Sequence, residues 1–232
     1  MRRLVLFSAI LLGCAAALQP LAAAATQAAL FGMVEVRAAS YVALPQWVRV
    51  MHGMARDEAV IRVCAEDRAR CPNPATAAWL DLLRGLAGAP ASRQLDAINR
   101  FVNQSSYVTD AANYGLRDYW ATALEFLARS GDCEDYAIAK YQSLRMLGWP
   151  PEALRFVVVQ DVLRDLPHAV LAAYLDGAIY ILDNLSDTAL EQSRVENYVP
   201  YYSVNEITRW AHLAPDRLVA GGSPPDVQPA RP

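Results

Sequence analysis

The sequence predicts an α+β domain in which N-terminal helices pack on an antiparallel β-sheet. Apolar residues recur at helical spacing from about residue 74 to residue 147. From Arg155 onward they form short continuous runs instead, beginning with Phe156-Val157-Val158-Val159. Asp176-Gly177 separates two such runs and is typical of a two-residue hairpin turn.

The chain begins with a segment typical of exported proteins. Arg2-Arg3 precede an apolar run and an alanine-rich tract, so we expect a signal peptide over 1–25. A lipoprotein remains the alternative, because the residues ending at Cys14 resemble a lipoprotein cleavage box. After leader removal we expect no transmembrane segment, since a spanning helix needs roughly 20 apolar residues.

The rest of the chain has the size and composition of one globular domain. We expect this domain over 26–215, followed by a disordered tail over 216–232 that is rich in glycine and proline. Hydrophobic residues make up 54% of the sequence, which supports a substantial core. The net charge is −3 and no basic run occurs, which argues against nucleic acid as a partner.

Cys64 and Cys71 form a close pair that fits an exported protein. A disulfide between them would close a small loop before Pro72. Half of a metal site is the alternative, but no second pair or histidine cluster completes it. We therefore expect the disulfide.

Four helices are expected before the sheet, each marked by residues that begin or end helices. Asn73 with Pro74, Ser92, and the possible capping box of Thr122 with Glu125 mark three starts. Residues 103–120 read as a long ordered loop. The four helices follow Asn73, Ser92, Thr122 and Asp132, and end near Gly85 or Gly88, Val102, Ser130 and Leu147.

The second half of the chain is expected to form the sheet. Strands are predicted over 155–160, 168–175 and 178–182, with a further strand over 198–203. A short helix is predicted over 206–212.

Cys133 is the candidate nucleophile. It begins the fourth helix, and it has no obvious disulfide partner, because Cys14 lies in the leader and the other two cysteines can pair. A helix N-terminus and a nearby imidazolium favour the thiolate form of cysteine. The alternative is that Cys133 is only a small buried hydrophobic residue.

The hairpin register brings a histidine and an aspartate together. A two-residue turn pairs Leu175 with Ala178, which places Asp183 opposite Val170. His168 shares a face with Val170, because side chains alternate along a strand. His168 and Asp183 are therefore expected to be diagonal neighbours on one face of the sheet. A one-residue slip would separate them.

These residues suggest a catalytic triad. His168 would accept the thiol proton of Cys133, and Asp183 would orient the imidazole. Main-chain N–H groups near the thiol could stabilise an oxyanion. The other histidines, His52 and His212, have no carboxylate in evident register.

Three acids flank the nucleophile, at Asp132, Glu134 and Asp135. Carboxylates beside a thiol raise its pKa, which opposes catalysis. One interpretation is that they simply complement the helix dipole. Alternatively a bound cation neutralises them, and such oxygen ligands suit calcium.

Four segments carry a resemblance to a known family: Asp118-Tyr119-Trp120-Ala121-Thr122, the block from Gly131 to Tyr141, His168-Ala169-Val170-Leu171 and Leu182-Asp183-Asn184. With them, the sequence resembles the bacterial transglutaminase-like cysteine peptidases from about Leu30 to His212. This resemblance implies a papain-like α+β fold, a triad on Cys133, His168 and Asp183, and calcium held by Asp132, Glu134 and, less directly, Asp135. Cys64 with Cys71-Pro72 also resembles this family, whereas Ala123 stands where proline is expected.

The resemblance also implies a biological role. It suggests a periplasmic endopeptidase that cuts a large surface adhesin near its N-terminus and so controls biofilm attachment, under an inner-membrane cyclic-di-GMP receptor. Two other functions stay open on the sequence alone. One is an acyltransferase or amidase that uses the same triad on cell-wall peptides, and the other is a non-catalytic calcium-binding or receptor-binding module.

Overall fold

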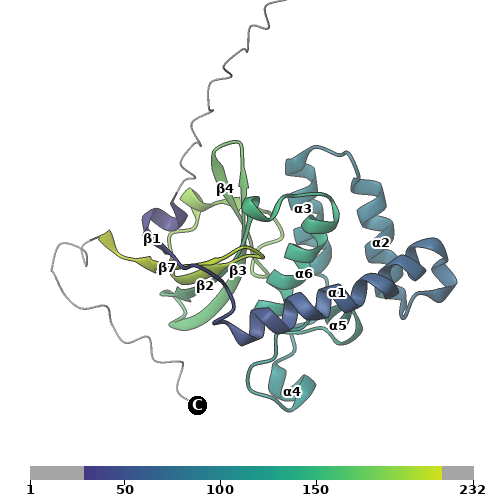
Figure 1. Ribbon diagram of the computed structural model, residues 1–232. Helices are drawn as coiled ribbons and strands as arrows, with labels where there is room; N and C mark the ends of the chain where they lie inside the picture. Colours follow the sequence, from purple (N-terminus) through teal and green to yellow (C-terminus); the bar gives the residue numbers. More distant parts are fainter. Residues whose placement is uncertain (1–28, 216–232) are drawn as a thin grey trace, which may run out of the picture.

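Figure 1 shows the computed structural model of the chain, which describes residues 29–215. The predicted signal peptide, Cys14 and the predicted tail at 216–232 lie outside the described residues. Within residues 29–215, no helix has both the length and the apolar character needed to cross a membrane.

Six α-helices precede the central strands in the chain. They are α1 (Pro45–Glu66), α2 (Pro74–Leu86), α3 (Ala91–Val102), α4 (Asp110–Tyr114), α5 (Ala123–Arg129) and α6 (Cys133–Met146). Short 3-10 helices are η1 (Leu30–Gly32), η2 (Arg68–Arg70), η3 (Pro151–Ala153) and η4 (Gln192–Arg194).

The described strands form one antiparallel sheet in the order β1-β7-β6-β2-β3-β4-β5. They are β1 (Val34–Arg37), β2 (Leu154–Asp161), β3 (Leu166–Leu175), β4 (Ala178–Leu182), β5 (Leu190–Glu191), β6 (Tyr198–Val204) and β7 (Arg209–Leu213). Because β1 pairs with β7, the two ends of the domain meet at one edge of the sheet.

The helices gather on one side of the sheet, with α6 against β2 and β3 (Figure 1). Side chains alternate between the two sheet faces, so Phe156 and Leu171 join the helical core while Val157 and Val170 lie on the opposite face. Leu30 of η1 packs into that second, smaller cluster. This architecture confirms the predicted α+β class.

Local capping explains where two of the helices begin. Asn73 Oδ1 accepts the Thr76 N–H at 2.8 Å, and proline occupies the first position of α2. Thr122 and Glu125 form the predicted capping box of α5. The predicted Ser92 cap is wrong, because α3 already begins at Ala91, directly after Pro90.

The hairpin between β3 and β4 has the predicted turn and register. Leu175 pairs with Ala178, and Leu171 pairs with Leu182. Asp176 and Gly177 both have positive φ, at 51° and 83°, which is the conformation that Asp-Gly turns favour. The two turn residues therefore fix the register of this part of the sheet.

Several elements differ from the sequence predictions. The helix predicted over 206–212 is wrong, because Arg209–Leu213 form β7 and pair with β6 and β1. Asn205 Oδ1 instead accepts two main-chain N–H groups in a turn that leads from β6 into β7. The strand β1 and the long helix α1 were not predicted, and α4 interrupts the loop expected over 103–120.

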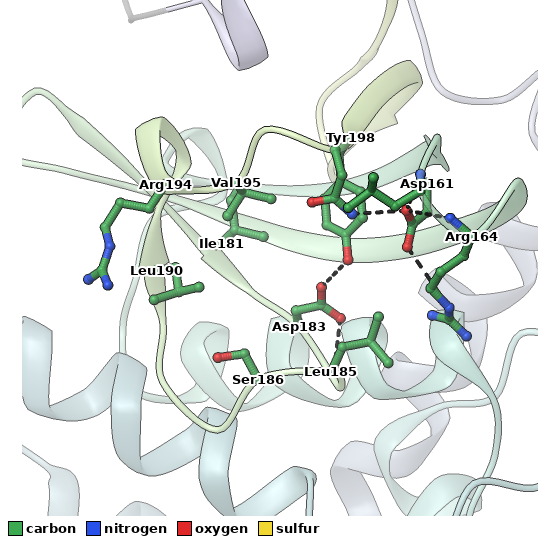
Figure 2. Close-up of a pocket in the computed structure, with 12 residues that line it drawn as sticks. Asp161, Arg164, Ile181, Asp183, Leu185, Ser186, Leu190, Arg194, Val195 and Tyr198 are labelled. Carbon is green, nitrogen blue, oxygen red and sulfur yellow. Dashed lines mark hydrogen bonds and ion pairs between the residues drawn. The ribbon is translucent and has the colours of Figure 1, made fainter.

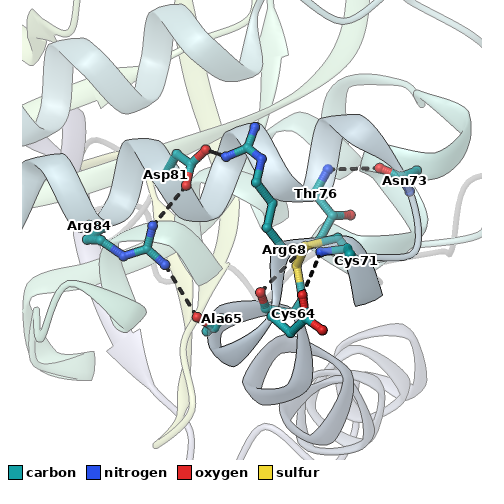
Figure 3. Close-up of a disulfide and its surroundings, with 10 residues drawn as sticks. Cys64, Ala65, Arg68, Cys71, Asn73, Thr76, Asp81 and Arg84 are labelled. Carbon is teal, nitrogen blue, oxygen red and sulfur yellow. Dashed lines mark hydrogen bonds and ion pairs between the residues drawn. A yellow bond between two sulfur atoms is a disulfide. The ribbon is translucent and has the colours of Figure 1, made fainter.

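A disulfide joins Cys64 near the end of α1 to Cys71 before α2, as Figure 3 shows. The bridge confirms the predicted pairing and removes the alternative of a metal site, because both thiols are consumed. Asp81 of α2 pairs with Arg68 and, at 2.8 Å, with Arg84 beside it.

Candidate active site

Cys133 is the first residue of α6, directly after the N-cap residue Asp132. Its half-buried thiol donates a hydrogen bond to Glu134 Oε2 at 3.1 Å. The main-chain N–H of Ala169 on β3 also hydrogen-bonds the sulfur. The turn before Cys133 is tight, because a Cβ on Gly131 would clash with the Asp135 side chain of α6. Glycine is therefore required there.

His168 and Asp183 lie together as the register predicted. His168 Nε2 is 2.8 Å from Asp183 Oδ1, and both side chains are buried. Since Nε2 bonds the carboxylate, Nδ1 is the ring nitrogen left available for a thiol proton. Asp183 also accepts the Leu185 N–H at 3.0 Å and the Tyr198 hydroxyl at 2.5 Å (Figure 2).

The structure joins His168 to Asp183 and sets the Cys133 thiol against the main chain of β3, without a hydrogen bond between the thiol and the imidazole among the described residues. The Cys133 sulfur accepts the hydrogen bond of the Ala169 main-chain N–H, and Ala169 directly follows His168 in β3. Among the described residues, the sulfur makes no hydrogen bond to His168. Catalytic hydrogen bonds are often long before substrate binds, so this geometry is compatible with proton transfer.

The surroundings lower the pKa of the candidate acid, Asp183, and raise the pKa of the candidate nucleophile, Cys133. Burial alone would raise the pKa of Asp183, but hydrogen bonds from His168 and Tyr198 outweigh it and lower the pKa. Burial and then the charge of Glu134 raise the pKa of the Cys133 thiol. Asp183 is thus held ionised, whereas Cys133 needs compensating positive charge to become a thiolate.

Three carboxylates converge beside Cys133 and could hold a metal ion. Ligand oxygens of Asp110, Asp132 and Glu134 lie within 4.8 Å of one another. Asp110 Oδ1 and Asp132 Oδ1 are buried and have no hydrogen-bond partner among the described residues. Orphaned carboxylate oxygens of this kind fit a hard divalent cation such as Ca²⁺.

The same carboxylates resist ionisation without such an ion. Burial, with the charge of Asp132, raises the pKa of Glu134 to about 9. Burial also raises the pKa of Asp110 to about 6, and the charge of Asp132 adds to this shift. A positive charge at this position would therefore stabilise the ionised forms of these carboxylates.

Asp135 lies outside this group of three. Its Oδ1 accepts the Ala121 N–H at 2.6 Å, which ties α6 to the loop before α5. Burial raises its pKa to about 8. The ligand role expected for Asp135 therefore stays a prediction, while the geometry offers Asp110 as the third carboxylate.

Two residues of the site were missed in the sequence. Asp110 begins α4, and it reaches the nucleophile because Tyr107 pairs with Gly131 in an isolated bridge. Tyr198 begins β6 and reaches Asp183 across the sheet. No local spacing connects either residue to the triad. The sequence offers one local signal for Asp110: it is an acid at the start of a helix, within a loop rich in aromatic residues.

A cavity of about 280 Å³ opens beside Asp183 and Tyr198. Ile181 and other apolar side chains line it, and Figure 2 shows Arg164 and Arg194 at its opposite ends. Its charged lining is balanced, because Asp161 and Asp183 lie there with the two arginines.

Comparisons with known proteins place this chain in a family. The family model of bacterial transglutaminase-like cysteine proteinases matches residues 58–217. Calcium-bound LapG of Legionella pneumophila is 32% identical, with a TM-score of 0.57 over 65% of this chain and 85% of that one. A second structure of Legionella LapG is 30% identical, with a TM-score of 0.58 over 70% and 91%.

A third, EGTA-treated structure of Legionella LapG is also 30% identical, with a TM-score of 0.57. The comparison with curated proteins gave no match. The family model, the LapG structures and the α+β fold agree, and the chain belongs to the bacterial transglutaminase-like cysteine proteinases.

Proposed function

We propose that this protein is a calcium-dependent periplasmic cysteine endopeptidase with Cys133 as nucleophile, His168 as base and Asp183 as orienting acid. One observation carries the proposal: the buried 2.8 Å contact between His168 and Asp183, next to the main-chain N–H that bonds the thiol. The family supports the same chemistry.

The residues of the chain divide the reaction between them. His168 Nδ1 takes the thiol proton, and the Cys133 sulfur attacks the peptide carbonyl. The leaving amine receives that proton from His168, and water then hydrolyses the acyl-enzyme with His168 again as base. Asp183 holds the imidazole in the tautomer with a proton on Nε2. The first N–H groups of α6, which lack intrahelical partners, face the developing oxyanion.

Asp110, Asp132 and Glu134 would hold the calcium ion. When bound, calcium would supply positive charge that offsets these carboxylates beside the Cys133 thiol. Two observations support this assignment: the orphaned oxygens of Asp110 and Asp132, and the calcium-bound form of the Legionella relative.

The substrate and location follow from the family resemblance and the leader. We propose a large surface adhesin that is cut near its N-terminus, with release of attached cells as the result. Regulation by an inner-membrane cyclic-di-GMP receptor belongs to the same proposal. The cavity beside Asp183 would receive substrate residues on the leaving-group side.

Cleavage of an adhesin N-terminal fragment by the purified protein tests this function. We expect Cys133→Ala and His168→Ala to lower the rate by a factor of about 10⁴ or more. His52→Ala is the matched control, because His52 is exposed on α1 and should leave the rate unchanged. Cleavage by Cys133→Ala at the wild-type rate would refute the proposal.

Two further measurements separate the alternatives. Chelation with EGTA should stop cleavage and added calcium should restore it, whereas activity in EGTA removes the calcium assignment. Mass spectrometry of products formed with an added amine distinguishes hydrolysis from acyl transfer. Amidated product would favour the acyltransferase that shares this triad.

A further inference from the structure

Residues 29–31 are held against the sheet by side chains from two other elements. Leu30 of η1 is fully buried in the cluster on the sheet face opposite the helices, where Tyr198 also lies. Gln192 of η4 holds the main chain on both sides of it. Its Oε1 accepts the Phe31 N–H at 2.9 Å, and its Nε2 donates to Ala29 O at 3.3 Å. Because a side-chain amide has both a donor and an acceptor, one glutamine fixes this stretch of main chain.

A buried ion pair supplies the second anchor. Glu35 of β1 accepts the Leu30 N–H at 3.2 Å through Oε1. Both of its carboxylate oxygens also accept from Arg155 of β2, at 2.8 Å. The Arg155 guanidinium lies 3.9 Å from the centre of the Trp210 ring, which holds it in place. Charge-assisted hydrogen bonds are stronger than neutral ones, so the position of η1 is well determined.

Phe31 has a backbone conformation that a bulky residue rarely adopts. Its φ is 49° and its ψ is 31°, in the left-handed region. Such a conformation is unfavourable for a residue with a Cβ, and it persists only where the surrounding structure imposes it. The anchors at Gln192 and Glu35 impose it here. The fold therefore holds Phe31 in one specific place.

In that place the ring of Phe31 contacts the ring of Tyr198. The two ring centres are 6.3 Å apart and the planes meet at 86°, which is an edge-to-face contact. Tyr198 in turn contacts both residues of the proposed dyad. Its ring centre lies 5.5 Å from that of His168, and its hydroxyl donates to Asp183 Oδ2 at 2.5 Å (Figure 2). Direct contacts thus run from η1 through Tyr198 to the proposed base and acid.

We propose that Phe31 is a positioning residue that acts through Tyr198, because its ring holds the phenol where the hydroxyl bonds Asp183. An aromatic ring turns readily about χ2, so its hydroxyl keeps one position only where neighbours lock the side chain. The inference rests on the proposed triad. It assigns Phe31 no contact with substrate.

Steady-state cleavage of the adhesin fragment measures this effect. In Phe31→Ala we expect kcat to fall about threefold or more with little change in KM, because the loss is that of one aromatic pair behind the triad. Phe31→Tyr keeps the ring and should restore kcat. Phe101→Ala is the packing control, because Phe101 is also half-buried but lies on α3 against the helical core. It should leave kcat unchanged.

A double-mutant cycle tests whether the effect passes through the Tyr198 hydroxyl. Tyr198→Phe removes this hydroxyl and keeps the ring. In that background we expect Phe31→Ala to lower kcat no further, since no hydroxyl is left to position. If the two single effects instead multiply, Phe31 acts independently of the hydroxyl and the inference is overturned.

Nuclear magnetic resonance tests the same contact without enzyme activity. In protein labelled with ¹³C at the hydroxyl-bearing carbon of tyrosine, the Tyr198 signal is the one that Tyr198→Phe removes. Asp183→Ala shows where this signal lies without its hydrogen bond. We expect Phe31→Ala to move the signal towards that position, and Phe101→Ala to leave it in place.

The outcomes also distinguish this inference from the proposed function. An unchanged kcat or an unmoved Tyr198 signal in Phe31→Ala would overturn the inference while the triad stands. If Cys133→Ala stayed active, the triad would fall, and the signal would still report whether Phe31 holds the Tyr198 hydroxyl on Asp183.

Discussion

The environment of Cys133 works against its own ionisation. The thiol bonds Glu134 at 3.1 Å, and burial together with that carboxylate raises its pKa. A helix N-terminus alone is worth only about 0.3–1 kcal/mol to an anion in exposed surroundings. In the proposed mechanism, His168 and a cation held by the neighbouring acids would supply the remaining stabilisation of the thiolate.

Tyr198 should be needed for full activity. Its hydroxyl donates to Asp183 Oδ2 at 2.5 Å, and its ring lies 5.5 Å from the His168 ring. Loss of one hydrogen bond to a charged group costs about 1.5–3 kcal/mol. In Tyr198→Phe we expect kcat to fall about tenfold or more with little change in KM, as measured by steady-state cleavage.

Tyr201→Phe is the matched control for this prediction. Tyr201 lies on the same strand, but its hydroxyl donates to Gln160 on the exposed surface. The Tyr201→Phe variant should keep the wild-type kcat. A Tyr198→Phe enzyme with unchanged kcat would show that Asp183 does not depend on this hydroxyl.

At the scale of elements, the β3–β4 hairpin and α6 carry the site, and local chemistry specifies both. Asp176-Gly177 sets the turn and hence the register that pairs His168 with Asp183. The Thr122–Glu125 capping box was also predictable from the sequence. By contrast, β7 was misread as a helix, because its partners β6 and β1 are set by tertiary pairing rather than local spacing.

The misread strand carries a buried histidine that should make stability depend on pH. His212 Nε2 contacts Ser203 Oγ at 2.8 Å, and burial lowers the pKa of His212 from 6.5 to about 4. Between pH 6.5 and 4 the unfolded chain takes up a proton that the folded chain excludes. The folded state therefore loses stability as pH falls through this window.

Denaturant unfolding of the wild type and His212→Gln at pH 7.5 and pH 4.5 measures this effect. We expect the wild type to lose about 3 kcal/mol more than the variant on acidification. His52→Gln, at an exposed histidine of α1, should behave as the wild type does. Equal pH dependence of the wild type and His212→Gln would mean that His212 is protonated in the folded protein.

At the scale of the whole molecule, the site forms where the helical layer meets the sheet. The candidate nucleophile comes from α6, the candidate base and acid from the β3–β4 hairpin and the residue after it, and the third carboxylate of the acidic cluster from α4. Asp110 could not be predicted, because it lies 23 residues before Cys133 and reaches it only through the folded loop. The contact between His168 and Asp183 was predictable because one hairpin register brings the two residues together.

Calcium should stabilise the whole fold, because it would bind the folded cluster and not the unfolded chain. At 100 times its dissociation constant, a ligand adds about 2.7 kcal/mol, enough to raise Tm by several degrees. We expect this rise in the wild type by calorimetry, and its loss in Asp110→Asn. Asp165→Asn, in the exposed β2–β3 loop, is the control. Equal Tm in calcium and in EGTA would exclude Ca²⁺ from the cluster.

The reactivity of Cys133 itself tests the central claim most directly. In a Cys14→Ser chain with the Cys64–Cys71 bridge intact, Cys133 is the remaining free thiol. The measurement is its alkylation rate by iodoacetamide at pH 7, with calcium and with EGTA, in the wild-type site and in His168→Ala. We predict fast labelling only with calcium and His168 together. Equal rates in all four conditions would contradict a nucleophile activated by His168 and calcium.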